Sequence, residues 1–201
     1  MEQLFVRVAW LALTYVIGSL PFGLIIGRVF CAKDPRQHGS GNLGATNVAR
    51  SCGKGWGAAT LVLDAGKGFL PVAVAMTFSQ SVFFLSLTAL AAIMGHMFSM
   101  LLGWRGGKGV ATTIGVFLAL APWPLFLALL VFAGVAWLSG HVSLASLAMA
   151  GVLPLFLLLS GSFGLFLLSI VVMGLLFQSH RENILRLAAG HEHSWRGSTP
   201  S

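Results

Sequence analysis

The stretch LASLAMAGVLPLFLLL, residues 144–159, contains no charged side chain and is typical of a helix inside a bilayer. Of the 201 residues in the chain, 57% are hydrophobic and only 8% are charged. A soluble domain carries about a quarter charged residues, so the bilayer is the expected solvent here. We therefore predict one all-α integral membrane domain over residues 1–192. A polar tail follows at residues 193–201, and this tail could be disordered.

Other long apolar stretches repeat this pattern and predict a compact bundle of about seven transmembrane helices, some of them short. Pro21 is expected to kink the first helix, which a membrane helix tolerates. Five spans remain the alternative if the two shorter central segments do not cross the bilayer fully. The predicted helices cover residues 4–29, 58–78, 82–102, 110–121, 125–139, 144–159 and 163–179.

Every Lys and Arg except Arg7 falls on one predicted side of the bundle. Cytoplasmic loops are enriched in Lys and Arg, so this asymmetry predicts an outside N-terminus and a cytoplasmic C-terminus. The formal net charge of +7 would suggest nucleic acid as the partner of a soluble protein. Because the membrane asymmetry already explains much of the charge, we expect membrane lipid as a partner and no nucleic acid.

The first basic, glycine-rich segment is SGNLGATNVAR, residues 40–50. Gly41 and Gly44 allow turns in which successive N–H groups converge on an anion. Arg50 adds a planar guanidinium that matches two phosphate oxygens, and a helix starting near residue 45 would add its positive end. A polar turn with a capped helix is the simpler alternative. The neutral donors of the segment are Ser40, Asn42, Thr46 and Asn47.

The second segment, Gly106-Gly107-Lys108-Gly109, directly precedes a predicted helix and is expected to expose backbone donors to an anion. It is not a Walker A loop, because Leu102 stands where that motif requires glycine. A lipid head-group anchor would explain Lys108 but not the three glycines.

The third segment begins where the last helix leaves the membrane. On a continuing helix, His180 and Asn183 share one face, while Arg181 and Glu182 point elsewhere. The two former residues could serve a site, or the segment could be a simple helix cap. Ser143 has the same ambiguity, since it could cap a helix or donate to a phosphate.

Asp64 and Lys67 lie three residues apart on a predicted membrane helix, where charges are rare and are usually paired or functional. Mutual pairing is the simpler interpretation, as is a packing role for His96, and all three are candidates for supporting a site. The chain has only five acidic residues and neither a GxSxG elbow nor an HExxH motif. We therefore expect no metal, no cofactor and no conventional hydrolase.

Five segments in order resemble the bacterial acyl-phosphate-dependent glycerol-3-phosphate acyltransferases, the PlsY family. The resemblance covers the chain to about Glu192, and five ordered motifs are far more specific than any one of them. The matching segments are Gly18–Gly23, Ser40–Arg50, Asp64–Gly68, Gly106–Thr112 and His180–Ile184.

This resemblance implies transfer of an acyl chain from acyl phosphate to the 1-hydroxyl of sn-glycerol 3-phosphate. The products would be 1-acyl-glycerol 3-phosphate (lysophosphatidate) and phosphate, in the first step of bacterial phospholipid synthesis. The implied setting is the bacterial inner membrane, with the active site on its cytoplasmic face and no obligate protein partner. A membrane transporter for a phosphorylated solute is the alternative, and a structural, lipid-binding membrane protein is a third.

Under this hypothesis the residues of these segments are divided between the phosphates of the two substrates. Ser40, Gly41, Asn42 and the glycines Gly106, Gly107 and Gly109 hold acyl phosphate, while Thr46 and Asn47 shape the pocket. No residue is a certain catalyst, because a substrate phosphate oxygen could take the hydroxyl proton, with His180 as the rival base. The residues expected to clamp glycerol phosphate are Arg50, Lys108, Ser143, His180 and Asn183.

Overall fold

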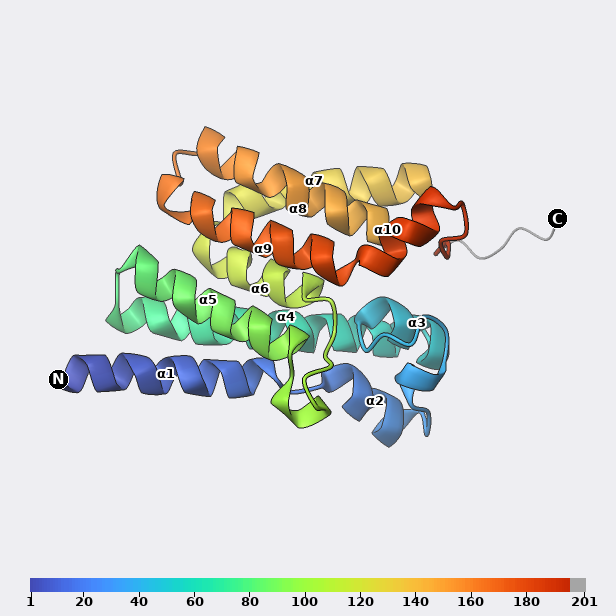
Figure 1. Ribbon diagram of the computed structural model, residues 1–201, viewed down its shortest axis with the longest axis horizontal. Coiled ribbons are helices and arrows are strands. Elements are labelled where there is room, and N and C mark those ends of the chain that lie inside the picture. The colour runs from blue at the N-terminus through green and yellow to red at the C-terminus, as the bar shows by residue number, and fades with distance from the viewer. Residues whose placement is uncertain (196–201) are drawn as a thin grey trace. The chain divides into compact units, whose positions relative to one another are not determined.

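The structure is a computed structural model that describes residues 1–195, and within them all regular structure is helical (Figure 1). The chain divides into two compact units, Met1–Leu120 and the part from Ala121 onward. The expectation of a single domain over 1–192 stays a prediction. Most of the predicted tail, 196–201, lies outside the described residues. Its ordered start is held to the second unit, because Trp195 donates from its backbone N–H to the Gly140 carbonyl oxygen over 3.0 Å.

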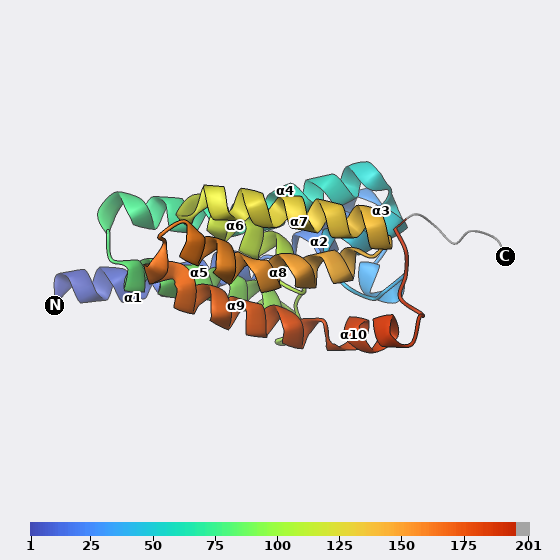
Figure 2. The same ribbon diagram turned by 90° about the horizontal axis from the view of Figure 1, so that it is seen from above.

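The first unit is built around one long helix, α4. It packs against α3, α5 and α6, and α1 packs against α5 (Figures 1 and 2). The α-helices of this unit are α1 (Glu2–Gly18), α2 (Phe22–Phe30), α3 (Ala45–Cys52), α4 (Lys54–Phe78), α5 (Val82–Met97) and α6 (Val110–Leu120). Two short 3-10 turns, η1 (Pro35–Gln37) and η2 (Met100–Leu102), lie in its loops.

In the second unit, α8 packs against both α7 and α9 (Figure 2). The chain bends by 62° between α9 and the short helix α10. The elements of this unit are α7 (Pro122–Ser139), α8 (Val142–Leu159), η3 (Phe163–Leu165), α9 (Phe166–Ser179) and α10 (Arg181–Ala188).

The seven predicted apolar ranges are mainly helical, with breaks at residues 19–21 and 98–99, and this confirms an all-α integral membrane fold. Within the described part of the chain, five segments are long and apolar enough to cross a bilayer, and a sixth qualifies if the bent pair α9–α10 counts as one span. Helix α6 has only 11 residues, in line with the expectation that some segments are short. The side on which each terminus lies stays a prediction.

The first span is interrupted rather than kinked. Helix α1 ends at Gly18 and α2 begins at Phe22, with Pro21 at the N-cap of α2. Proline has no N–H and its ring clashes with the preceding turn, so the helical ladder stops at Pro21. The break leaves the carbonyl oxygen of Leu20 outside the helical hydrogen-bond ladder, where the side chain of Lys67 can reach it.

Small residues let the helices of the first unit approach closely. A Cβ atom at Gly115 would collide with the carbonyl oxygen of Ala65, and one at Gly68 with that of Thr112. A Cβ atom at Gly18 of α1 would likewise collide with the carbonyl oxygen of Ala92 in α5. Membrane helices associate largely through such close contact, so these glycines bring α6 onto α4 and α1 onto α5.

Candidate functional site

Asn47 organises the loop that precedes α3. Its Oδ1 accepts the Ser40 N–H over 2.9 Å, and its Nδ2 donates to the carbonyl oxygens of Pro35 (2.8 Å), His38 (3.0 Å) and Asn42 (2.8 Å). The residue is only 1% exposed. One amide side chain therefore holds four points of the loop, which makes Asn47 a positioning residue.

The backbone donors of this loop are largely used within it, contrary to the expectation that they converge on an anion. Gly41, with φ of +69°, donates its N–H to the His38 carbonyl, and Gly44 donates to Oδ1 of Asn42 over 2.8 Å. The Ser40 N–H is already bound to Asn47. What the segment presents is side chains, with Ser40 and Arg50 exposed and Thr46 half-buried. The helix expected near residue 45 is present as α3.

The glycines before α6 also serve packing rather than exposed donors. The N–H of Gly106 donates to the Met97 carbonyl over 2.9 Å, and that of Gly107 donates to the His96 carbonyl over 3.0 Å. Gly109 has φ of +88°, a conformation that favours glycine. The loop is thereby held against the C-terminal end of α5, and the half-buried Lys108 is placed just before α6.

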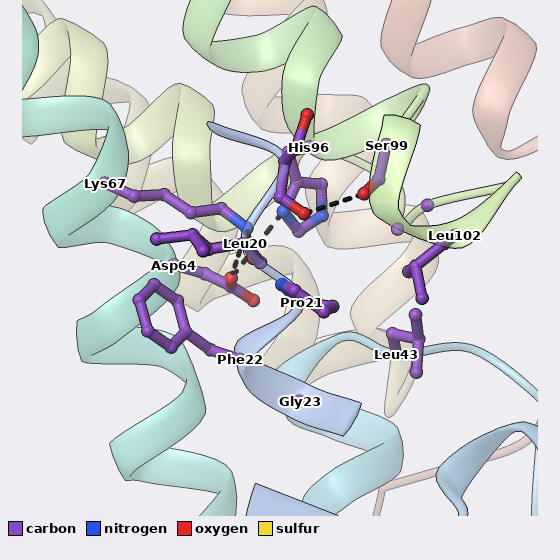
Figure 3. Close-up of a pocket in the computed structure, with 13 residues that line it drawn as sticks. Leu20, Pro21, Phe22, Gly23, Leu43, Asp64, Lys67, His96, Ser99 and Leu102 are labelled. Atoms are coloured by element: carbon purple, nitrogen blue, oxygen red, sulfur yellow. Dashed lines mark hydrogen bonds and ion pairs between the residues drawn. The ribbon is translucent and has the colours of Figure 1, made fainter. Parts of the chain in front are cut away.

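Three ionisable side chains form a buried cluster in the first unit. Nζ of Lys67 lies 2.8 Å from Oδ1 of Asp64 and donates to the Leu20 carbonyl over 2.6 Å. Nδ1 of His96 lies 3.6 Å from the same carboxylate oxygen. Figure 3 shows Lys67 and His96 both pointing toward Asp64. The predicted mutual pairing of Asp64 and Lys67 is confirmed, and the cluster borders a narrow pocket that is also lined by Gly106 and Gly107.

In the second unit, the carboxylate of Glu192 collects three donors. Its Oε1 accepts from Ser143 Oγ (2.9 Å) and Asn183 Nδ2 (2.6 Å), and its Oε2 accepts from Arg186 Nε (2.8 Å). Partial burial raises the pKa of Glu192, but these hydrogen bonds outweigh it and hold the pKa below the ordinary range. Two predicted site residues, Ser143 and Asn183, are thus brought together by a residue that sequence reasoning left without a role.

A signal for Glu192 was present, since it is one of only five acidic residues and follows the third motif within Gly190-His191-Glu192. Gly190, with φ of +72°, ends α10 and turns the chain back. That turn brings the carboxylate to Asn183, nine residues away in sequence. The spacing of residues along the chain did not reveal the role of Glu192, because its contact with Asn183 depends on the turn at Gly190.

His180 lies at the bend between α9 and α10 and is 2% exposed. Its Nδ1 is 2.8 Å from the Leu176 carbonyl oxygen. A carbonyl only accepts, so Nδ1 carries the proton and Nε2 is the acceptor in the neutral ring. His180 and Asn183 are both buried, whereas Arg181 and Glu182 are exposed, as predicted for the two faces of the segment.

Asp34 binds two guanidinium groups at the start of the first loop. Its carboxylate accepts from Arg28 Nη2 (2.9 Å), from Arg36 Nη2 (2.6 Å) and from Arg36 Nε (3.0 Å). The hydrogen bonds from Arg36, followed by those from Arg28, hold the pKa of Asp34 well below its usual range despite partial desolvation. The carboxylate also accepts the Arg36 N–H, which starts η1.

We expect the structural order of the loop formed by residues 31–44 to be lost at acidic pH. A lowered pKa in the folded state means that the contribution of Asp34 is complete above about pH 4 and is lost as the pH falls toward the lower folded value. Hydrogen-exchange protection factors of this loop in detergent, corrected for the intrinsic exchange rate at each pH, should therefore be high at neutral pH and fall in acid. Asp34→Asn should have lower protection factors at neutral pH and lose that acid dependence. An equal fall of the protection factors in wild type and variant would contradict the role given to Asp34.

Within residues 1–195, no group of three or more His, Cys, Asp and Glu side chains is placed to hold a metal ion. In the first unit the structure brings the glycine loop together with Asp64, Lys67 and His96. In the second it brings Ser143, Asn183 and Glu192 together. These features define a helical integral membrane protein with two polar clusters, one between α4, the end of α5 and the glycine loop, and one where α8 meets α10 and the segment that follows it.

The chain belongs to the glycerol-3-phosphate acyltransferase family, whose model matches residues 8–190. A relative of that name from Nitratidesulfovibrio vulgaris is 55% identical over 187 residues, covering 93% of this chain but 57% of its own length. One from Desulfovibrio desulfuricans is 51% identical, covering 94% of this chain and 85% of the relative. The family consists of acyltransferases, which makes the chain an enzyme of that class.

A solved structure shows the same fold. The crystal structure of PlsY, an integral membrane glycerol 3-phosphate acyltransferase, in its glycerol 3-phosphate form has a TM-score of 0.90 and 38% sequence identity. The match covers 94% of this chain and 96% of that one. The resemblance inferred from five sequence motifs is thus confirmed at the level of the family.

Proposed function

We propose that this protein transfers a fatty acyl group from acyl phosphate to the 1-hydroxyl of sn-glycerol 3-phosphate. The products are 1-acyl-glycerol 3-phosphate (lysophosphatidate) and inorganic phosphate, in the first step of bacterial phospholipid synthesis. The observation that carries the proposal is the family match over residues 8–190. This range includes all three candidate phosphate-binding segments, which begin at Ser40, Gly106 and His180. Glycerol 3-phosphate is taken from the names of the relatives and of the solved structure.

The chemistry needs little from the protein beyond positioning. Acyl phosphate is a mixed anhydride, so its acyl carbon is already activated. The hydroxyl oxygen attacks that carbon, the bond from the carbon to the phosphate oxygen breaks, and the departing phosphate takes the hydroxyl proton. Orienting the two reactants can lower the barrier by about 7–11 kcal/mol. Cationic groups near the leaving phosphate add electrostatic stabilisation.

The side chains support this division of work. We assign acyl phosphate to the Ser40 and Asn42 side chains, since the backbone donors around them are already bound. Glycerol phosphate is assigned to Arg50, Lys108, Ser143, His180 and Asn183. Glu192 accepts from both Ser143 and Asn183 and so holds these two side chains together for this role.

We further propose that the enzyme resides in the bacterial inner membrane with its active site on the cytoplasmic face. The asymmetry of Lys and Arg supports this orientation. Cysteine substitutions at the exposed residues Gln3 and Arg181, labelled from either side of sealed vesicles, test it. Labelling of both positions from the same side would contradict the orientation.

The decisive experiment supplies purified protein in detergent with acyl phosphate and glycerol 3-phosphate. We expect equimolar release of phosphate and lysophosphatidate. Acyl-CoA in place of acyl phosphate should give no product. Uptake of glycerol 3-phosphate into sealed vesicles, without any lysophosphatidate, would instead favour the transporter alternative.

His180→Ala separates substrate binding from base catalysis. In the neutral ring Nε2 is the acceptor, so we assign it a hydrogen bond from glycerol phosphate. Loss of a hydrogen bond to a charged ligand weakens binding by about 10–100-fold, so KM for glycerol 3-phosphate should rise by that factor with kcat within about threefold. His191→Ala, an exposed histidine of the same segment, is the matched control. A fall in kcat of about a thousandfold at constant KM would make His180 the base.

A further inference from the structure

The imidazole of His96 lies between the buried carboxylate of Asp64 and the loop that carries Lys108. On one side, Nδ1 is 3.6 Å from Oδ1 of Asp64. On the other side, a Cβ atom built on Gly107 would collide with Nε2 and Cε1 of the ring and would lie in tight contact with Cδ2. His96 is 7% exposed, so the ring has little freedom to move away.

The two neighbouring glycines contact different parts of the same residue. A Cβ atom on Gly107 meets only side-chain atoms of His96, whereas one on Gly106 meets the backbone carbonyl of His96. Both N–H groups are bound to carbonyl oxygens at the end of α5, those of His96 and Met97. The backbone bonds attach the loop to α5, and the imidazole limits how closely the chain at Gly107 can approach.

The carboxylate of Asp64 is also held in place by Lys67. Lys67 pairs with it and reaches the Leu20 carbonyl in the break between α1 and α2. Just beyond that break, Gly23 lies so close to the Leu43 carbonyl oxygen that a Cβ atom would not fit. The buried cluster is therefore connected both to the glycine loop and to the segment that contains Ser40 and Asn42 (Figure 3).

We propose that His96, oriented by Asp64, is a positioning residue that sets the place of the Gly106–Gly109 loop and, through it, of Lys108. This inference rests on the function proposed above, in which Lys108 binds substrate phosphate. His96 acts through the loop and contacts no reacting atom. A misplacement of about 1 Å in a positioning group can lower a rate about a hundredfold, so small shifts of this loop matter.

A double-mutant cycle tests the contact directly. Gly107→Ala pushes a methyl group into the imidazole, and we expect it to lower kcat/KM at least tenfold. His96→Ala should also lower kcat/KM about tenfold. Since His96→Ala removes the ring that the added methyl group would strike, the double variant should stay within about threefold of His96→Ala alone.

Gly106→Ala is the matched control within the same loop. Its methyl group strikes a backbone carbonyl, which persists in His96→Ala, so the effects of these two substitutions should multiply. If the losses in Gly107→Ala/His96→Ala multiply in the same way as those in Gly106→Ala/His96→Ala, the imidazole does not set the loop and the proposal is wrong.

A second pair of variants keeps the test usable if His96→Ala does not fold. Asparagine places an amide near the position of Nδ1 and leaves the space before Gly107 vacant, whereas glutamine extends toward the position of Nε2. His96→Asn should therefore relieve Gly107→Ala, and His96→Gln should not. Equal relief by both substitutions would contradict the proposal.

Hydrogen exchange of the backbone amides at positions 106 and 107 gives a readout that does not need activity. Exchange should accelerate in Gly107→Ala and slow again in Gly107→Ala/His96→Asn. Thr88→Val removes another buried polar group of α5, whose hydroxyl donates to Phe84, and should lower thermal stability without changing KM or loop exchange. An inactive wild type would refute the proposed function, while the exchange pattern would still decide the role of His96.

Discussion

Asn47→Asp should lower kcat/KM at least a hundredfold while the membrane helices stay folded. In the native protein, Nδ2 of Asn47 donates to three backbone carbonyl oxygens, and Oδ1 accepts the Ser40 N–H. Aspartate keeps the acceptor for Ser40 but places a carboxylate oxygen opposite three carbonyls. Repulsion then replaces the hydrogen bonds that the two amide protons share among these three carbonyls inside a buried site.

The expected size follows from the cost of unsatisfied buried groups. Each one costs about 1–3 kcal/mol, and about 2.7 kcal/mol corresponds to a hundredfold change in an equilibrium or rate. Three carbonyls lose their donor together, so the native loop arrangement should be displaced. The side chains of Ser40 and Asn42 move with that loop, because both residues are bound to Asn47.

Measurement of kcat/KM for both substrates, together with thermal unfolding of the membrane fold, checks this expectation. Asn47→Ala should be no worse than Asn47→Asp, since it removes the donor without adding a repulsive oxygen. Gln37→Ala, an exposed amide in the same loop, should remain near wild type. An Asn47→Asp enzyme within tenfold of wild type would show that the loop does not depend on this side chain.

Glu192→Ala should also reduce kcat/KM at least a hundredfold, with a lower unfolding temperature. The substitution removes the acceptor shared by Ser143, Asn183 and Arg186. Asn183 and Ser143 would then lose their orientation, and Arg186 would lose a carboxylate whose side chain is only 7% exposed. Loss of a charge-assisted hydrogen bond costs about 1.5–3 kcal/mol, and three donors are affected at once.

Two other substitutions make the Glu192 test specific. Glu192→Gln keeps one oxygen that can accept from Asn183 and Ser143 but faces Arg186 with an amide, so we expect an intermediate loss. Glu182→Ala removes a mostly exposed carboxylate 4.0 Å from the same Arg186 and should stay near wild type. If Glu192→Ala behaved like Glu182→Ala, Glu192 would have no part in holding Ser143 and Asn183.

Local sequence patterns determined the class of fold and the position of most elements. Charge-free apolar runs predict membrane helices because the bilayer core leaves no other way to satisfy the backbone. The same reasoning located α6 directly after Gly109, whereas the helix from about residue 45, now α3, was only a suggestion from the glycine-rich motif. It also paired Asp64 with Lys67, since residues three apart share a helix face.

Only the tertiary structure decided which partner each polar group of the loops takes. The glycines before α6 were expected to expose N–H donors, yet Gly106 and Gly107 donate to the end of α5. Lys67 reaches Leu20, 47 residues away, and Ser143 meets Glu192 at a separation of 49. Helical and membrane patterns are read within a few turns, whereas these hydrogen bonds depend on how distant segments pack, which residue types and spacing do not specify.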